Sequence, residues 1–148
     1  MYKHILIATD GSELAAKGLK HGFAIAEPLG AKVTVLTVTE PLSSRAAQAA
    51  MAAGVRDPAG RYDQAIDDEM KARFGEIEKH AQEHGVKVEL LHEIDEHPAE
   101  AIVRSAKLLN CDLIVMSSHG RRGARRLILG SQTSEVVTHT TIPVLVIR

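Results

Sequence analysis

The stretch that decides the fold is CDLIVMSSHGRRGARRLILGSQTSE, residues 111–135. It opens with an apolar run, passes through three glycines and four arginines, and then takes on the pattern of a helix. Short apolar runs rich in β-branched residues are typical of strands buried in a parallel sheet. The stretch therefore predicts a strand, a loop and a helix in succession, with glycine and positive charge concentrated in the loop.

Similar apolar runs recur along the chain and alternate with helical patterns. We expect strands at residues 5–8, 33–38, 86–90, 113–116 and 144–147. Helices are expected from Ser12 to Gly30, from Tyr62 to Gly85, from Pro98 onward and from Ser131 to Thr140. Residues 86–90 alternate apolar and charged side chains, which predicts a half-exposed strand at a sheet edge. Strict alternation of strand and helix predicts an α/β fold. We expect one domain over residues 1–148, a doubly wound, open, parallel five-stranded sheet with helices on both faces.

One connection is much longer than the others and covers residues 40–61. Its middle, SSRAAQAAMAAG, is rich in alanine and could form a mobile helix or a lid. Long connections inside a compact domain are usually functional or disordered. We therefore treat residues 40–61 as a flexible or partly helical insertion.

Composition excludes several classes of function. Eighteen basic residues face 19 acidic ones, and aromatic residues make up 3% of the chain. A nucleic-acid or membrane-surface binder needs a surplus of one charge, and base stacking needs aromatic platforms. No apolar run reaches the roughly 20 residues of a membrane span, and Cys111 is the one cysteine. We expect a cytoplasmic protein with no nucleic-acid or membrane partner.

The glycine-rich loop has the properties of a phosphate cradle. In open α/β sheets, ligands bind at the carboxyl ends of strands, and this loop leaves such an end. Gly120, Gly123 and Gly130 would allow positive φ and close approach of a ligand to the backbone. Ser131 and the following amides open a helix whose N-terminus favours an anion, and arginines supply forked donors for phosphate. A plain glycine turn is the alternative interpretation.

Two other predicted strand ends could complete a nucleotide site. Asp10 follows the first strand and could accept hydrogen bonds from ribose hydroxyls. The alternative is that Asp10 helps to start the first helix. Val38 ends the second strand, and its backbone could bind the edge of an adenine.

The chain resembles the universal stress protein family over nearly all of its length. The resemblance lies in ATDGSE after the first strand, in VLTV of the second, and in SSHGRRG, LILGS and IPVLVIR near the end. ATP-binding members of that family carry G-x-x-G, nine residues, and then G-[S/T]. Gly120, nine residues and Gly130-Ser131 match this motif, whereas Ser117 replaces its first glycine. The Ser117 side chain could crowd the nucleotide or could add a hydrogen bond to it.

The resemblance implies a fold of the adenine nucleotide alpha hydrolase-like, or Rossmann-like, type. It implies adenine and ribose contacts from Ala8, Thr9, Asp10, Val38 and Met116. It also implies phosphate contacts from Gly120, Arg121, Gly123, Gly130, Ser131, Gln132 and Thr133, with Ser117, Ser118 and His119 lining the turn. Arg122 is a further candidate for a phosphate contact. The expected ligand is ATP, or ADP or AMP, which Mg²⁺ can accompany.

Other motifs carry weaker interpretations. His80, Glu83 and His84 match the zinc-peptidase pattern H-x-x-E-H, but they lie on the solvated flank of a predicted helix. Cys111 fits a small buried side chain better than a reactive thiol. We therefore predict no metal site and no catalytic residue in this chain.

Three functions remain open at this point. The first is a nucleotide-binding sensor or regulator of the stress response, without robust turnover. The second is a slow ATPase or autophosphorylating enzyme, through Ser131 or Thr133. The third is a nucleotide-independent adaptor or chaperone-like dimer, if Ser117 blocks the site. In each case the apolar run from Pro143 to Ile147 predicts a homodimer, because an open edge this apolar needs a partner. The alternative is a short, covered edge in a monomer. The identity of any protein partner is unknown.

Overall fold

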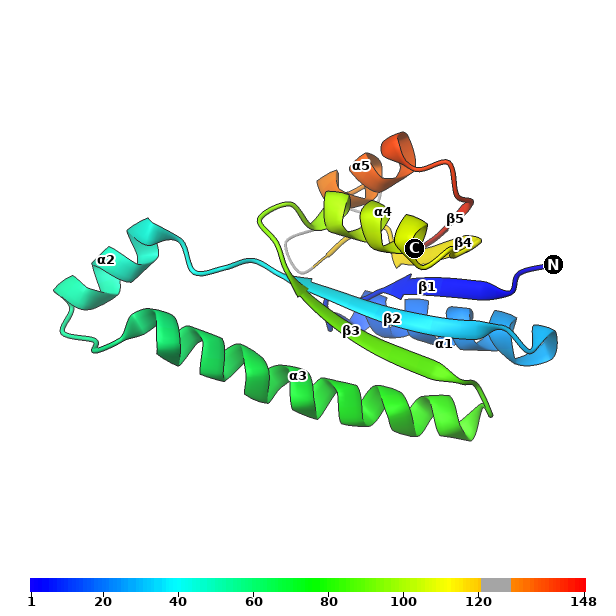
Figure 1. Ribbon diagram of the computed structural model, residues 1–148, viewed down its shortest axis with the longest axis horizontal. Helices are drawn as coiled ribbons and strands as arrows, with labels where there is room; N and C mark the ends of the chain where they lie inside the picture. The colour runs from blue at the N-terminus through cyan, green and yellow to red at the C-terminus, as the bar shows by residue number, and fades with distance from the viewer. Residues whose placement is uncertain (121–128) are drawn as a thin grey trace.

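The computed structural model describes residues 1–120 and 129–148. In chain order its elements are β1 His4–Ala8, α1 Glu13–Leu29, β2 Lys32–Thr39, α2 Ser44–Ala52, α3 Pro58–Glu83, β3 Val88–Ile94, α4 Pro98–Leu108, β4 Leu113–Ser117, α5 Ser131–His139 and β5 Val144–Ile147. The strands form one sheet in the order β3-β2-β1-β4-β5 (Figure 1). Every pair of neighbouring strands is parallel. The predicted five-stranded α/β fold is confirmed.

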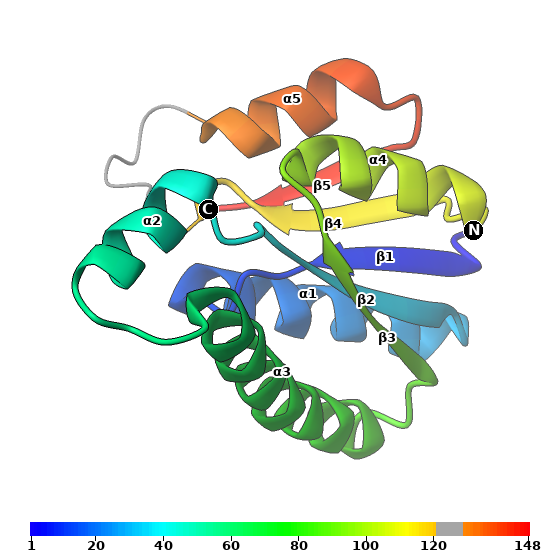
Figure 2. The ribbon, with the colours of Figure 1, turned by 60° about the vertical axis from the view of Figure 1, so that its left-hand side comes forward.

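Helices cover both faces of the sheet (Figure 2). One apolar cluster joins the sheet to Phe23 of α1 and Ile77 of α3. The other joins it to Ile102 of α4 and Val136 of α5. Because strand side chains alternate between the two faces, the central strands must be apolar at nearly every position. This requirement explains the continuous apolar runs in the sequence.

The third strand lies at a sheet edge, as predicted, but its bounds differ from the prediction. Val86 is not part of it. It follows the end of α3, where its N–H donates to the carbonyl of Ala81, and Gly85 before it is in the left-handed conformation. The strand instead continues to Ile94, paired residue by residue with β2. Its last residues are polar, which is why their pattern did not indicate a strand.

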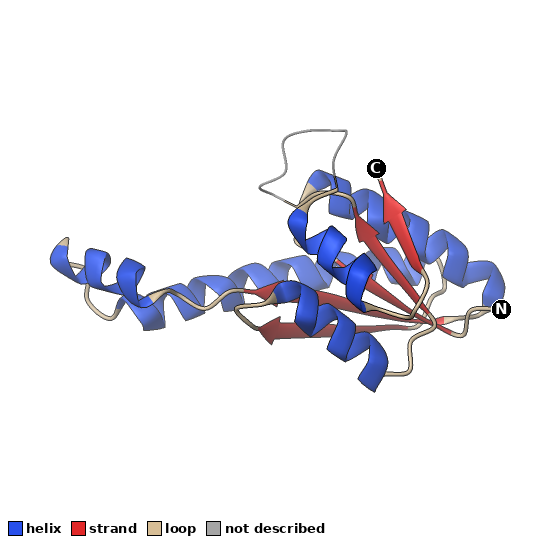
Figure 3. Cartoon of the chain, turned by 90° about the horizontal axis from the view of Figure 1, so that it is seen from above, coloured by secondary structure: helices blue, strands red, loops and turns tan. Residues whose placement is uncertain are grey.

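The long connection of residues 40–61 contains one helix and the start of another. Residues 44–52 form α2, and α3 begins at Pro58, where Asp57 accepts a hydrogen bond from Gly60. No residue of α2 is buried. In Figures 1 and 3, α2 and the first turns of α3 extend beyond the end of the sheet. The predicted flexibility of this segment stays a prediction.

The strand order places a topological switch point between β1 and β4. From β1 the chain winds outward through β2 to β3, whereas β4 and β5 lie on the other side. Loops diverge above the carboxyl ends of the strands at such a point and leave room for a ligand. No helix in the described parts of the chain is long and apolar enough to cross a membrane.

Candidate functional site

The loops that follow β1 and β4 meet at the switch point. The N–H of Gly130 donates to the carbonyl of Ser118 at 2.8 Å, which joins the two ends of the β4–α5 loop. Gly120 lies against Asp10: a Cβ added to this glycine would be 2.8 Å from Oδ2 of Asp10. The structure therefore brings Asp10, Ser118, Gly120 and Gly130 together, as the sequence predicts. Arg121, Arg122 and Gly123 lie outside the described residues.

The glycines are required for space rather than for an unusual backbone conformation. The φ of Gly130 is −57°, and Gly120 is not among the glycines with positive φ. Our expectation of positive φ at these two positions is therefore wrong. A Cβ on Gly130 would lie 3.1 Å from the carbonyl oxygen of Ser118, so this position is closed to larger residues by its own loop.

The start of α5 offers hydrogen-bond donors that have no acceptor among the described residues. The first bond of the helix runs from the N–H of Ser134 to the carbonyl of Gly130, at 2.9 Å. The N-cap residue is Gly130, which has no side chain to cap this end. No described residue accepts a hydrogen bond from the backbone N–H of Ser131, Gln132 or Thr133. These three donors and the positive end of the helix dipole form an environment that favours an anion.

The side chains of the first turn of α5 have different roles. The Thr133 hydroxyl is buried and donates to the carbonyls of Ser117, at 2.8 Å, and Ser118, at 3.3 Å. The Gln132 side chain accepts a hydrogen bond from the N–H of Ala99 at the start of α4, at 3.0 Å. Ser131 is exposed. Of these residues, Gln132 and Thr133 can therefore face a ligand with their backbone, and Ser131 with its side chain as well.

His119 carries a polar atom that nothing in the described chain satisfies. Its Nδ1 is 2.8 Å from the hydroxyl of Ser118, which fixes the ring. Its Nε2 is buried and has no hydrogen-bond partner among the described residues. Buried polar atoms are nearly always paired, so an unpaired one at a loop junction is a sign of a ligand group. Among the described residues, the hydroxyl oxygen of Thr37 is the other buried polar atom without a partner.

The ends of β1 and β2 present backbone and carboxylate groups to the same edge. Oδ1 of Asp10 accepts from the N–H of Ser12 at 3.0 Å, so Asp10 does help to start α1, while Oδ2 lies beside Gly120. The N–H of Thr9 donates to the carbonyl of Leu36, and the β1–β2 pairing ends there. Val38 lies two residues further along, so its backbone groups point to the same side, beyond the end of β1. Ala8 and Met116 pack into the core on the α4 face of the sheet.

Sequence reasoning missed Arg73 of α3. Its guanidinium group lies over Gly11, which has a φ of 78° and could not carry a side chain without displacing it. Arg73 also forms an ion pair with Glu69, one turn earlier. The spacing of this pair was visible in the sequence, but its position beside the β1 loop was not.

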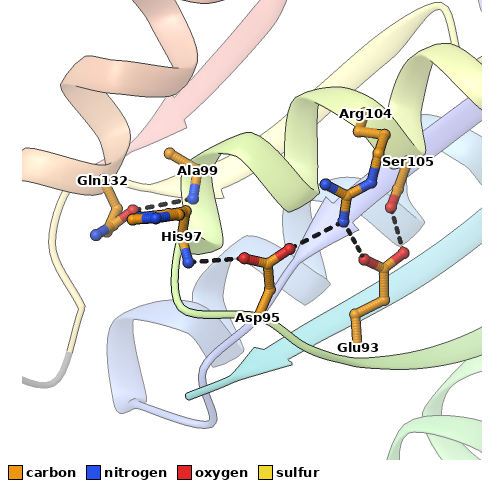
Figure 4. Close-up of polar contacts among 7 residues, drawn as sticks. All are labelled: Glu93, Asp95, His97, Ala99, Arg104, Ser105 and Gln132. Carbon is orange, nitrogen blue, oxygen red and sulfur yellow. Dashed lines mark hydrogen bonds and ion pairs between the residues drawn. The ribbon is translucent and has the colours of Figure 1, made fainter. Parts of the chain in front are cut away.

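A second polar cluster lies nearby, between β3 and α4 (Figure 4). Arg104 donates to Glu93 at 2.9 Å and to Asp95 at 3.1 Å, and the Ser105 hydroxyl donates to Glu93 at 2.6 Å. The backbone N–H of His97 donates to Asp95 at 2.8 Å. This N–H and the Arg104 guanidinium lower the pKa of Asp95. Each of these groups has its partner within the cluster.

The remaining candidate motifs have structural partners. His84 is 2.9 Å from Glu27 of α1, and His80 is 3.3 Å from Glu83. Within residues 1–120 and 129–148, no group of three His, Cys, Asp or Glu side chains could hold a metal ion. Cys111 is buried, and burial raises the pKa of its thiol to about 11.

The family is shown by the match of the whole chain, residues 1–148, to the universal stress protein family. The protein belongs to this family. Among its relatives, universal stress protein MJ0577 of Methanocaldococcus jannaschii is 30% identical, with 100% of this chain and 96% of the relative covered. The solved structure of MJ0577 superposes with a TM-score of 0.81 at 31% identity, covering 99% of this chain and 96% of that chain.

Two further solved structures share the fold. A universal stress protein in complex with cAMP has a TM-score of 0.72 at 20% identity, covering 99% of this chain and 97% of that chain. A universal stress protein of Archaeoglobus fulgidus in complex with dAMP has a TM-score of 0.67 at 20% identity, covering 99% of this chain and 98% of that chain.

Proposed function

We propose that the protein binds an adenine nucleotide, ATP, ADP or AMP, at the carboxyl edge of β1, β2 and β4 and the start of α5. The observation that carries this proposal is the set of backbone N–H groups of Ser131, Gln132 and Thr133, which lie in the first turn of α5 and have no described acceptor. An anion there would satisfy all three and would interact with the helix dipole. Family members with this fold have been solved with cAMP and with dAMP.

The geometry suggests how the nucleotide would lie. Phosphates would lie between Gly120 and the start of α5, beside the turn that carries His119, whose buried Nε2 has no hydrogen-bond partner among the described residues. The ribose would lie near Asp10, and the adenine edge would meet the backbone of Val38. Arg121, Arg122 and Gly123 belong to this proposal through the family motif alone. Mg²⁺ would arrive with the nucleotide, held by its phosphates.

In this proposal the protein is a cytoplasmic sensor or regulator of the stress response, and turnover is not its main activity. A second candidate is slow ATP hydrolysis or autophosphorylation. One observation limits which residue could be phosphorylated. The Thr133 hydroxyl is buried and already donates to two carbonyls, whereas Ser131 is exposed at the proposed anion site. An autophosphorylated form would therefore carry its phosphate on Ser131.

Incubation of the purified protein with labelled ATP separates these functions. A sensor retains ATP unchanged, an enzyme converts it to ADP or labels Ser131, and a nucleotide-independent adaptor retains nothing. The small molecule released from freshly purified, denatured protein would show which nucleotide is preferred. Titrations with ATP, AMP and adenosine then measure the contribution of the phosphates.

We also propose that the protein forms a homodimer through β5. This strand lies at the edge of the sheet, and its first three residues are only half-buried in the single chain. An apolar edge strand can pair with its copy across a two-fold axis. Sedimentation at micromolar concentration should give a dimer, and Val146→Pro should give a monomer or an insoluble chain. A monomeric wild type would contradict the proposal.

A further inference from the structure

Ser117 lies at the end of β4, in the position where the ATP-binding motif of the family has a glycine. The residue is 8% exposed, and its backbone is not in the left-handed region, so serine fits here without strain. Its hydroxyl donates to the carbonyl of His119 at 2.9 Å, two residues further along the same turn. The only proton of this hydroxyl is therefore committed to the protein and points at neither an adenine nor a phosphate.

This bond completes a pattern in the turn of residues 117–119. The carbonyl of Ser117 accepts from the Thr133 hydroxyl, and the carbonyl of Ser118 accepts from the N–H of Gly130 and from Thr133. The carbonyl of His119 accepts from Ser117. All three carbonyl oxygens of the turn are thus held by protein donors. A carbonyl oxygen that turned toward a phosphate would repel it.

The peptide between His119 and Gly120 depends on this bond most strongly. In a trans peptide the C=O and the N–H point in opposite directions, so fixing the His119 carbonyl also fixes the Gly120 N–H. Gly120 is exposed, and no described residue accepts from its N–H. Glycine opposes rotation of a peptide plane less than any other residue, because it has no Cβ. Without the Ser117 hydroxyl, no hydrogen bond among the described residues holds this peptide in one orientation.

We infer that Ser117 is a positioning residue of the anion site: its hydroxyl holds the His119–Gly120 peptide with the N–H, and not the C=O, toward the bound phosphate. The inference rests on the proposed nucleotide binding. It differs from both expectations drawn from the sequence, since the side chain neither crowds the ligand nor donates to it. Where the family motif has a glycine, Ser117 makes a side-chain hydrogen bond that a glycine could not make.

The test compares Ser117→Ala, Ser117→Gly and Ser117→Thr with the wild type in calorimetric titrations of ATP and adenosine. Ala and Gly should each weaken ATP binding about fivefold, which corresponds to one net hydrogen bond of about 1 kcal/mol. Adenosine binding should not change, and Thr should restore ATP binding. Ser105→Ala is the matched control, because it removes a buried serine hydroxyl that donates to Glu93 away from the site.

A second measurement uses the protein without nucleotide. NMR relaxation dispersion at the Gly120 amide should detect exchange in Ser117→Ala that is absent from the wild type and from Ser117→Thr. Unchanged ATP affinity in Ser117→Ala, or tighter ATP binding by Ser117→Gly, would overturn the inference. A wild type that binds no nucleotide would instead overturn the proposed function, and the inference with it. If Ser117→Ala does not fold, Ser117→Gly decides the question alone.

Discussion

Two polar regions lie at the carboxyl ends of the strands, and they differ in how well their groups are paired. In the α4 cluster, formed by Glu93, Asp95, Arg104 and Ser105, every one of these side chains has a partner within 3.1 Å (Figure 4). At the β4–α5 loop, the first N–H groups of α5 and Nε2 of His119 have none among the described residues. Polar density alone therefore does not mark a binding site. The proposed site is instead distinguished by donors that have no described acceptor and lie beside closely packed glycines.

The largest effect should come from filling the space at the glycines. Gly120→Val would push against the Asp10 carboxylate, and Gly130→Val against the Ser118 carbonyl. Overpacking costs about 1 to 3 kcal/mol, so ATP affinity should fall by about 5- to 150-fold in each variant, with the fold retained. Gly75→Ala on α3, where a Cβ meets no neighbour, should leave binding unchanged. Wild-type affinity in both valine variants would remove this loop from the site.

The next largest effect should come from removing the Thr133 hydroxyl, which donates to two carbonyls of the loop. Thr133→Val keeps the shape of the side chain but removes its donor, which should destabilise the protein by about 1 to 3 kcal/mol. ATP affinity should fall more than adenosine affinity, because the carbonyls beside the phosphates are released. Thr138→Val removes an exposed hydroxyl that donates to Ser134 on the same helix, and it should change neither property. Thermal unfolding and calorimetry measure both, and equal losses for the two ligands would contradict the assignment.

A change in the α4 cluster should lower the stability of the protein slightly and leave ATP binding unchanged. Arg104→Gln removes two charge-assisted hydrogen bonds that are half exposed to solvent. Exposed ion pairs contribute little, so the melting temperature should fall slightly, and less as salt increases. ATP affinity should equal that of the wild type. A loss of affinity comparable to that of the glycine variants would mean that the two regions are not separate.

The smallest effect is a pH dependence in the same cluster. The pKa of Asp95 is lowered by the His97 N–H and by Arg104, so the folded state favours its charged form. This contribution to stability is present above the unfolded pKa of about 3.9 and is lost as the pH falls through the lower folded pKa. The difference in melting temperature between the wild type and Asp95→Asn should therefore be largest near neutral pH and should shrink below about pH 4. A difference that grows on acidification would contradict this cause.

Much of the fold could be predicted because burial on both faces leaves a clear pattern. The runs at 113–116 and 144–147 are apolar throughout, and both are strands. The edge strand was misplaced because an edge strand can end in polar residues: His92 pairs with Thr39 and Glu93 with Arg104, contacts that no local pattern contains. The start of α3 was placed too late, although Asp57 and Pro58 are ordinary signals for the beginning of a helix.

Part of the candidate site could likewise be predicted from the sequence, and part could not. Motif spacing indicated Gly120 and Gly130, and the structure places Gly120 beside Asp10 and Gly130 beside Ser118. Spacing could not show that Ser117 bonds to His119, since a hydroxyl can turn in three directions from the same backbone. Nor could it place Arg73 over Gly11, because that contact depends on how α3 packs against the sheet.

The most direct measurement follows the backbone amide signals of the protein by NMR while ATP is added. The amides of Ser131, Gln132 and Thr133 should shift strongly. Those of Thr9, Asp10 and Gly120 should shift as well. The amides of Arg104 and Ser105 in the α4 cluster should not shift. AMP should shift the same amides, and adenosine should leave those of α5 nearly unchanged. No shift at the start of α5 under saturating ATP, or shifts confined to the α4 cluster, would contradict the claim that this loop binds the phosphates of a nucleotide.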